Sequence, residues 1–184
     1  MTEPKLFGIP GALRKASTNR LLLAEARRSF GPASYAEGDL RLPLYDRDLE
    51  DAEGIPPEVQ RLADGIADAD AVVISTPEYN KAPPGVLKNA LDWVSRTSGR
   101  PFRDKPVAII SAADGRGGGD RSQFALRLML MSFRPLVLPG PEVLVPDSGN
   151  AFDAEGRLML EPQLKMLRLL MADLRKAAGF PPAE

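Results

Sequence analysis

The sequence of 184 residues contains neither cysteine nor histidine. Their absence excludes disulfides, Cys/His zinc sites, thiolate nucleophiles and every Ser-His-Asp triad. An enzyme of this composition must use carboxylates, Lys, Tyr or Arg, or a bound organic cofactor that carries the chemistry. We assign no metal-ligating residues.

Long apolar runs and a strong charge of either sign are also missing. No stretch approaches the roughly 20 apolar residues of a membrane span, and the N-terminal stretch MTEPKLFGIPG lacks the apolar run of a signal peptide. The 24 basic and 25 acidic residues nearly cancel, so the overall charge indicates neither nucleic acid nor a membrane surface as a partner. We expect a cytoplasmic protein with one domain over residues 1–184.

The segment over residues 71–96 predicts a buried strand, a loop and a helix. Val72 to Ile74 is a β-branched run without polar alternation, as in a strand covered on both faces. A helix follows Pro84-Gly85, with apolar residues at i, i+3, i+4 and i+7 from Leu87. The loop at 78–81 then lies at the carboxyl end of a parallel strand, where ligands bind in open α/β sheets. The alternative is an ordinary solvated loop.

The N-terminal segment has the same organisation. Residues 5–9 predict a strand, and a helix is expected from Ser17 or Thr18 to about Arg28, with Ser17 as its N-cap. A loop that leads into a helix N-terminus can bind an anion, and Arg14 and Lys15 add positive charge beside it. The alternative is that Ser17 only caps the helix and that both cations are solvated.

The remaining chain continues the alternation of strands and helices. Further strands are expected at 33–40, 106–111, 137–138 and 143–145, and further helices at 56–66, 122–133 and 158–178. Polar stretches at 46–53 and 150–157 are interpreted as a solvated loop and a turn. A glycine-rich loop over residues 115–119 follows the strand at 106–111. This pattern predicts a doubly wound α/β fold with helices on both faces of a parallel sheet.

The predicted helix at 122–133 is apolar around almost its whole circumference. Because packing on a sheet covers only one side, we expect a second subunit on the other, with Trp93 at that interface. The alternative is that the C-terminal helix covers this side within one chain. Arg127 lies inside the apolar run and needs a carboxylate partner if it is desolvated, for which Glu142 is the candidate.

The loop and helix of the 71–96 segment resemble a known family. The sequence reads Pro77-Glu78-Tyr79-Asn80, then Pro84-Gly85, then LKNALDW over residues 87–93. This is similar to the signature of the NAD(P)H-dependent FMN reductases. Residues 11–19 resemble the phosphate-binding loop of that family, and the glycine-rich loop resembles its third flavin-contacting loop. The resemblance covers nearly the whole chain.

Membership of this family implies a flavodoxin-like fold with about five parallel strands and an FMN site formed by three loops. It implies an enzyme that passes hydride from NADPH or NADH through FMN to a small-molecule acceptor, such as a quinone, azo compound, free flavin or metal ion. No catalytic acid or base is assigned, since flavin hydride transfer need not use one, and a homodimer or homotetramer is expected. The resemblance assigns FMN binding to Arg14, Ser17, Asn19, Pro77, Glu78, Tyr79, Asn80, Ser111, Gly115, Gly118 and Gly119.

A non-enzymatic alternative stays open at this point. Ala12, Ala82 and Ala113 stand where the family usually has serine. Loss of a charge-assisted hydrogen bond to phosphate would cost about 1.5–3 kcal/mol if nothing replaced it. The alternative is a flavodoxin-like domain that does not retain flavin and acts as a binding module or an electron carrier.

Overall fold

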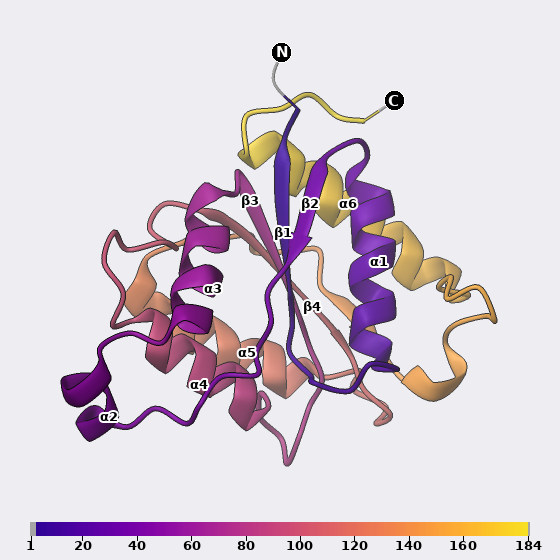
Figure 1. The fold of residues 1–184 in the computed structure, drawn as a ribbon. Coiled ribbons are helices and arrows are strands. Elements are labelled where there is room, and N and C mark those ends of the chain that lie inside the picture. The colour runs from indigo at the N-terminus through magenta and orange to yellow at the C-terminus, as the bar shows by residue number, and fades with distance from the viewer. Residues whose placement is uncertain (1–2, 184) are drawn as a thin grey trace.

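The computed structural model describes residues 3–183, which form a parallel sheet between two layers of helices (Figure 1). Within these residues the strands are β1 (Lys5–Pro10), β2 (Ser34–Glu37), β3 (Ala71–Thr76), β4 (Pro106–Ala112), β5 (Leu136–Val137) and β6 (Val143–Val145). The strand order is β2-β1-β3-β4-β5, with β6 also paired to β4. This is the flavodoxin-like order of doubly wound sheets. The fold class predicted from the sequence is confirmed.

The fifth position of the sheet is shared by two short strands. β5 pairs with the start of β4, at Pro106 and Val107, whereas β6 pairs with its end, from Ile110 to Ala112. The sheet therefore has the five strand positions that we expected, and the fifth position is divided between β5 and β6. Because all pairs are parallel, the carboxyl ends of β1, β3 and β4 lie at one edge.

Each face of the sheet carries its own helices and its own hydrophobic core. The helices are α1 (Thr18–Phe30), α2 (Arg47–Glu53), α3 (Pro57–Asp68), α4 (Gly85–Val94), α5 (Asp120–Leu130) and α6 (Glu161–Ala177), with 3-10 turns η1 (Met131–Phe133) and η2 (Ser148–Asn150). One core joins α1 and α6 to the sheet, and the other joins α3, α4 and α5 to the opposite face. Figure 1 shows these two groups on the right and left of the sheet. No helix within residues 3–183 is long and apolar enough to cross a membrane.

The segment at 46–53 is a helix, so its interpretation as a loop was wrong. Asp46 caps α2, accepting a hydrogen bond of 2.9 Å from the N–H of Asp48. Arg47 pairs with Asp51 one turn later at 2.9 Å. No residue of α2 is buried. Capping and charge pairs therefore form this helix without the apolar stripe that sequence periodicity detects.

Trp93 is fully buried within the chain and does not reach the surface. Its Nε1 donates to the carbonyl oxygen of Pro43 at 2.9 Å, and Tyr45 contacts its ring edge-on at 5.0 Å between centroids. The segment before α2 therefore covers Trp93. The expectation that Trp93 joins a subunit interface was wrong.

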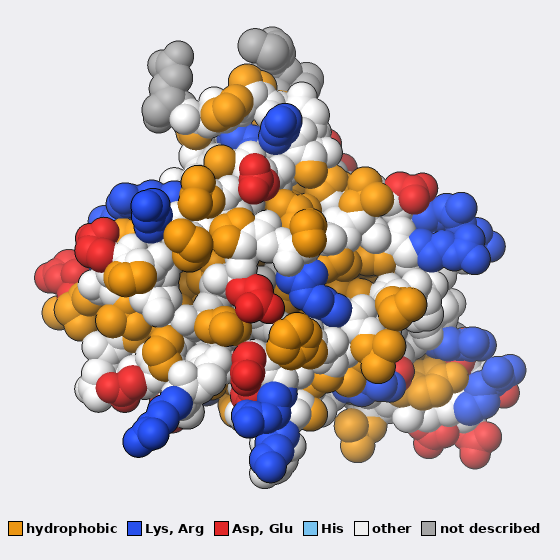
Figure 2. Space-filling model, turned by 180° about the vertical axis from the view of Figure 1, so that it is seen from behind, with side chains coloured by type: hydrophobic (Ala, Val, Ile, Leu, Met, Phe, Trp, Pro, Cys, Tyr) orange, Lys and Arg blue, Asp and Glu red, His pale blue; other side chains and the backbone are white. Residues whose placement is uncertain are grey.

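The outer side of α5 carries exposed apolar side chains within the single chain. Phe124, Leu128 and Met131 are 59%, 70% and 71% exposed. Figure 2 shows the face of the molecule that is turned away from the viewer in Figure 1, and hydrophobic side chains are spread over this face. The C-terminal helix α6 packs on α1 and the other face of the sheet, so it does not cover α5.

Arg127, on the flank of α5, is half-buried but makes no ion pair with Glu142 within residues 3–183. Its Nη1 donates to the carbonyl oxygen of Leu138 at 2.8 Å instead. Burial lowers the pKa of Arg127, and the charge of Glu142 acts in the opposite direction. A main-chain oxygen thus takes the place of the expected carboxylate partner.

Candidate functional site

A cavity of about 730 Å³ opens at the carboxyl edge of the sheet, where the loops after β1, β3 and β4 meet. Its volume lies in the range of small-molecule sites, about 300–1,000 Å³. Of the eleven residues assigned to FMN, all but Ser111 line it. The lining consists of Arg14, Ser17, Thr18, Asn19, Pro77, Glu78, Tyr79, Asn80, Lys81, Ala112, Ala113, Asp114, Gly115, Arg116, Gly117, Gly118, Gly119, Arg121 and Ser148.

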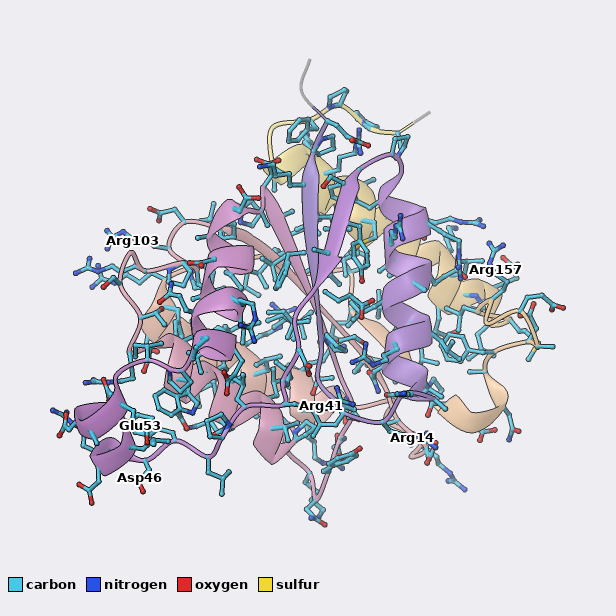
Figure 3. The ribbon with its side chains drawn as sticks, viewed as in Figure 1. Arg14, Arg41, Asp46, Glu53, Arg103 and Arg157 are labelled. Carbon is cyan, nitrogen blue, oxygen red and sulfur yellow. The ribbon has the colours of Figure 1, made fainter. Side chains whose placement is uncertain are left out.

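The first loop presents the N-terminus of α1 to the cavity. Ser17 caps the helix, its Oγ accepting from the N–H of Asn19 at 3.3 Å, and the first turn contains no acidic residue. Arg14 is exposed at the mouth, at the lower edge of the molecule in Figure 3. The positive end of the helix dipole and the guanidinium of Arg14 therefore both favour an anionic group here.

Asn19 is 1% exposed, and its carboxamide is used within the protein. Nδ2 donates to the carbonyl oxygen of Ala112 at 2.8 Å, while Oδ1 accepts from the Oγ of Ser75 at 2.8 Å and the N–H of Ala112 at 3.1 Å. These bonds tie the start of α1 to the ends of β3 and β4. Asn19 thus fixes the relative positions of the loops around the cavity.

The second loop is held at its base and closed by a tight turn. The hydroxyls of Thr76 and Ser122 both donate to the carbonyl oxygen of Pro77 at 2.9 Å. Beyond it, the N–H groups of Tyr79 and Ala82 each bond the other's carbonyl oxygen, at 2.9 and 3.1 Å. The two central residues of the turn have positive φ, as in a type I′ turn. Tyr79, 55% exposed, is thereby displayed on a fixed backbone.

The third loop requires glycine at two positions. Gly118 and Gly119 have φ of +58° and +95°. A Cβ on Gly118 would lie 2.9 Å from the backbone of Leu144, and one on Gly119 would lie 2.8 Å from the Cβ of Ser111. Gly115, in contrast, has no atom within 4 Å of where its Cβ would stand. The loop is therefore pressed against the sheet at one end and open toward the cavity at the other.

Ser111 lies beneath this loop and does not line the cavity. Its Oγ donates to the carbonyl oxygen of Gly118 at 2.6 Å and accepts from the Nε2 of Gln123 at 2.8 Å. Its side chain is fully buried. Ser111 thus positions the glycine loop, in place of the direct contact that the resemblance implies.

Two hydroxyl groups that sequence reasoning missed also line the cavity. The Oγ1 of Thr18 donates to the Oγ of Ser148 at 3.1 Å, and the Oγ of Ser148 donates to Oδ1 of Asp114 at 2.8 Å. Ser148 begins η2, just after β6. Its place after the last strand was the signal that could have found it, because the carboxyl ends of parallel strands share one edge.

The cavity carries more positive than negative charge. Its cationic residues are Arg14, Lys81, Arg116 and Arg121, and its acidic residues are Glu78 and Asp114. Arg121 pairs with Oε1 of Glu78 at 3.2 Å, while Oε2 of Glu78 is buried and makes no hydrogen bond within residues 3–183. A chain with a net charge of −1 therefore places a local excess of cations around this cavity.

Comparisons with known proteins agree on one family. A family model described as NADPH-dependent FMN reductase matches residues 4–150. An NAD(P)H-dependent FMN reductase of Pseudomonas aeruginosa is 42% identical over 180 residues, covering 93% of this chain and 97% of that protein. A quinone reductase of Escherichia coli is 43% identical over 138 residues, which is 73% of each chain.

A solved structure of a flavoenzyme is similar to this chain. The flavoenzyme FerB, an NAD(P)H:(acceptor) oxidoreductase from Paracoccus denitrificans, superposes with a TM-score of 0.85 at 29% identity. The match covers 96% of this chain and 97% of that one. The similarity therefore extends over nearly the whole length of both chains.

Proposed function

The chain belongs to the NADPH-dependent FMN reductase family, and on that premise we propose that its main cavity binds FMN and receives the nicotinamide and the electron acceptor in turn. The protein is an NAD(P)H-dependent oxidoreductase with FMN as its cofactor. The alternative of a domain that does not retain flavin is not favoured by these relatives. One observation carries the proposal: ten of the eleven residues expected to bind FMN line the same cavity, and this cavity has an excess of positive charge.

The residues present fit a flavin nucleotide. The N-terminus of α1 and the guanidinium of Arg14 offer N–H donors and positive charge to the phosphate. The open backbone at Gly115 leaves room for a flat ring to approach, which a side chain at this position would fill. Thr18 and Ser148 supply hydroxyl groups to the cavity, whose lining has alanine at position 113. Position 12, also alanine, is buried and does not line the cavity.

We assign distinct tasks to the loops. Arg14 and Ser17 bind the phosphate, while Asn19 and Ser111 hold the loops that surround it. Pro77, Glu78, Tyr79 and Asn80 border one edge of the ring, and Gly115, Gly118 and Gly119 border the other. When bound, FMN supplies the redox chemistry, accepting a hydride from the nicotinamide and passing electrons to the acceptor.

For the acceptor we propose a quinone. The support is the quinone reductase of Escherichia coli, which matches over most of this chain, together with an exposed aromatic ring at Tyr79 on which a planar acceptor can stack. Azo compounds, free flavin and metal ions are the other acceptors to be compared with it. A cytoplasmic location and a single domain over residues 1–184 stay predictions.

We also propose a homodimer or homotetramer in which a second copy covers the outer side of α5. Large apolar side chains are exposed together there, at Phe124, Leu128 and Met131. Contiguous apolar surface on a folded protein marks an interaction site. On α2 and α4, in contrast, Arg47 pairs with Asp51 and Lys88 pairs with Asp92 within the chain.

The test replaces Arg14 by Ala and follows flavin retention. The purified variant is incubated with FMN and desalted, and its absorbance between about 350 and 500 nm, the flavin range, is compared with that of the wild type. We expect loss of a charge-assisted contact to weaken FMN binding by about 10- to 100-fold, with an unchanged melting temperature of the apoprotein. NADPH added without oxygen should bleach the flavin in the wild type.

Lys15→Ala is the matched control. Lys15 is also an exposed cation of the first loop, but it does not line the cavity. The Lys15→Ala variant should retain flavin like the wild type. Equal FMN affinity of Arg14→Ala and Lys15→Ala would refute the phosphate assignment, and a wild type that never retains flavin would refute the proposed cavity.

A further inference from the structure

A second cavity, of about 510 Å³, lies beyond the ends of α4 and α5. It is lined by Val94, Ser95, Thr97, Arg100, Pro101, Arg103, Ser132, Phe133 and Arg134. These residues lead into the beginnings of β4 and β5, so the cavity lies at the opposite edge of the sheet from the flavin cavity. In Figure 3, Arg103 is at the upper left and Arg14 at the lower edge. The two cavities share no lining residue.

Three arginines and no acidic residue line this cavity within residues 3–183. Arg103 faces the exposed carboxylate of Asp104 at 3.5 Å. For Arg100 and Arg134, residues 3–183 provide no ion pair and no side-chain hydrogen bond. Two guanidinium groups therefore stand beside a concave surface with their donors unused.

The arginines are not needed as hydrogen-bond donors at the ends of the two helices. Hydroxyl groups already donate to the free carbonyl oxygens there: Ser95 to Asp92 at 2.6 Å, Thr97 to Val94 at 2.9 Å and Ser132 to Met129 at 3.3 Å. A role as helix caps would therefore not explain the arginines.

The backbone conformation at two of the arginines also supports a binding role. Arg100 and Arg134 have φ of +52° and +57°, and Arg134 follows η1 at the position where glycine is the favoured residue. The carbonyl oxygen of Arg134 accepts from the N–H of Asp104 at 3.0 Å, which joins the two loops. Residues other than glycine are uncommon in the left-handed region, and such positions cluster at functional sites.

We propose that this cavity binds a small molecule carrying two adjacent phosphate groups. Guanidinium groups bind phosphate oxygens in bidentate fashion, and three of them match a diphosphate better than a single phosphate. Val94, Pro101 and Phe133 give the cavity apolar walls, against which an attached base or ring can lie. The diphosphate is either inorganic or part of a nucleotide, and the site is separate from the flavin cavity.

The test is a calorimetric titration of FMN-saturated protein with inorganic pyrophosphate at low salt. Wild-type protein should bind saturably. The double variant Arg100→Gly/Arg134→Gly should bind at least about tenfold more weakly. Glycine accommodates both φ values, so the variant should keep a melting temperature close to that of the wild type. Arg168→Ala, which removes an exposed cation from α6, is the control and should bind like the wild type.

Replacing pyrophosphate by ADP identifies the source of the diphosphate. Tighter binding of ADP would assign the site to a nucleotide, and equal binding would assign it to the diphosphate group itself. Either result supports the site. No saturable binding by the wild type, or equal affinity in the double glycine variant, would overturn it.

Discussion

Glu25 is a buried carboxylate of α1 that anchors the segment after β6. Its side chain is 3% exposed and accepts hydrogen bonds from the Nη2 of Arg28 at 2.7 Å and the Nε of Arg157 at 3.1 Å. The N–H of Leu158 donates to it as well, at 3.3 Å. Burial alone would raise the pKa of Glu25, but these three donors together lower it from 4.5 to about 2. The charged form is thus stabilised by folding.

This shift predicts how stability depends on pH. Because the folded pKa is depressed, the contribution of Glu25 is fully present above pH 4.5 and is lost as the pH falls toward 2. Linkage gives a loss of about 2 kcal/mol in the free energy of unfolding by pH 3. In urea unfolding followed by circular dichroism between about pH 6 and 3, Glu25→Gln should start less stable and show a flatter pH dependence.

Glu155→Gln is the control for that experiment. Glu155 lies in the same surface segment as Arg157 but is exposed, and its carboxylate makes no hydrogen bond within residues 3–183. Its removal should leave both stability and pH dependence as in the wild type. Parallel curves for Glu25→Gln and the wild type would contradict the assignment.

Single residues also show where sequence reasoning about the site stops. The place of Arg14 and Ser17 at the cavity was predictable because a loop motif is local. The role of Asn19 was not, because it depends on Ser75 and Ala112, which come from distant strands. Ser148 was missed for the same reason, since its neighbour Thr18 is 130 positions away. Contacts of this kind exist only once the fold is known.

Elements were predictable where the apolar pattern was strong, either as a continuous buried run or as a helical period. The buried strands β3 and β4 and the amphipathic helix α6 were expected close to their observed positions. α2 was missed because its stability comes from an N-cap and ion pairs. The burial of Trp93 was missed because an irregular segment covers it, and no periodicity marks such a segment.

The glycine-rich loop allows a test of the flavin ring's position. A methyl group at Gly115 meets no protein atom within 4 Å, so Gly115→Ala should leave the apoprotein as stable as the wild type. If the ring borders Gly115, the added methyl group should weaken FMN binding by about tenfold, since overpacking costs about 1–3 kcal/mol. Quenching of flavin fluorescence on binding measures the affinity.

Gly149→Ala provides the comparison. Gly149 likewise has no atom within 4 Å of where its Cβ would stand, but it does not line the cavity. The Gly149→Ala substitution should change neither the stability of the apoprotein nor its affinity for FMN. If Gly115→Ala binds FMN as tightly as Gly149→Ala, the ring does not border Gly115.

Most of the apolar surface of the molecule is buried on the two faces of the sheet, but one apolar region stays exposed. Both faces of the sheet are closed by helices, and the side chains of β3 and β4 are fully enclosed. The outer side of α5 remains apolar and exposed, with Phe124 and Leu128 one turn apart and Met131 next in line where α5 passes into η1. Because these positions share one side of a helix, they form a continuous surface that a second copy can cover.

Leu128→Arg should therefore separate the copies. In a two-fold interface each substitution acts twice, and burying leucine contributes about 1.5–3 kcal/mol per side, so the dissociation constant should rise at least about 100-fold. Light scattering after gel filtration at micromolar concentration should show an oligomer for the wild type and a smaller species for Leu128→Arg, a monomer from a dimer or a dimer from a tetramer. Leu169→Arg, at a position 49% exposed on α6, should stay oligomeric. A monomeric wild type, or an oligomer that survives Leu128→Arg but not Leu169→Arg, would exclude α5 as the interface and leave its apolar side to a different partner.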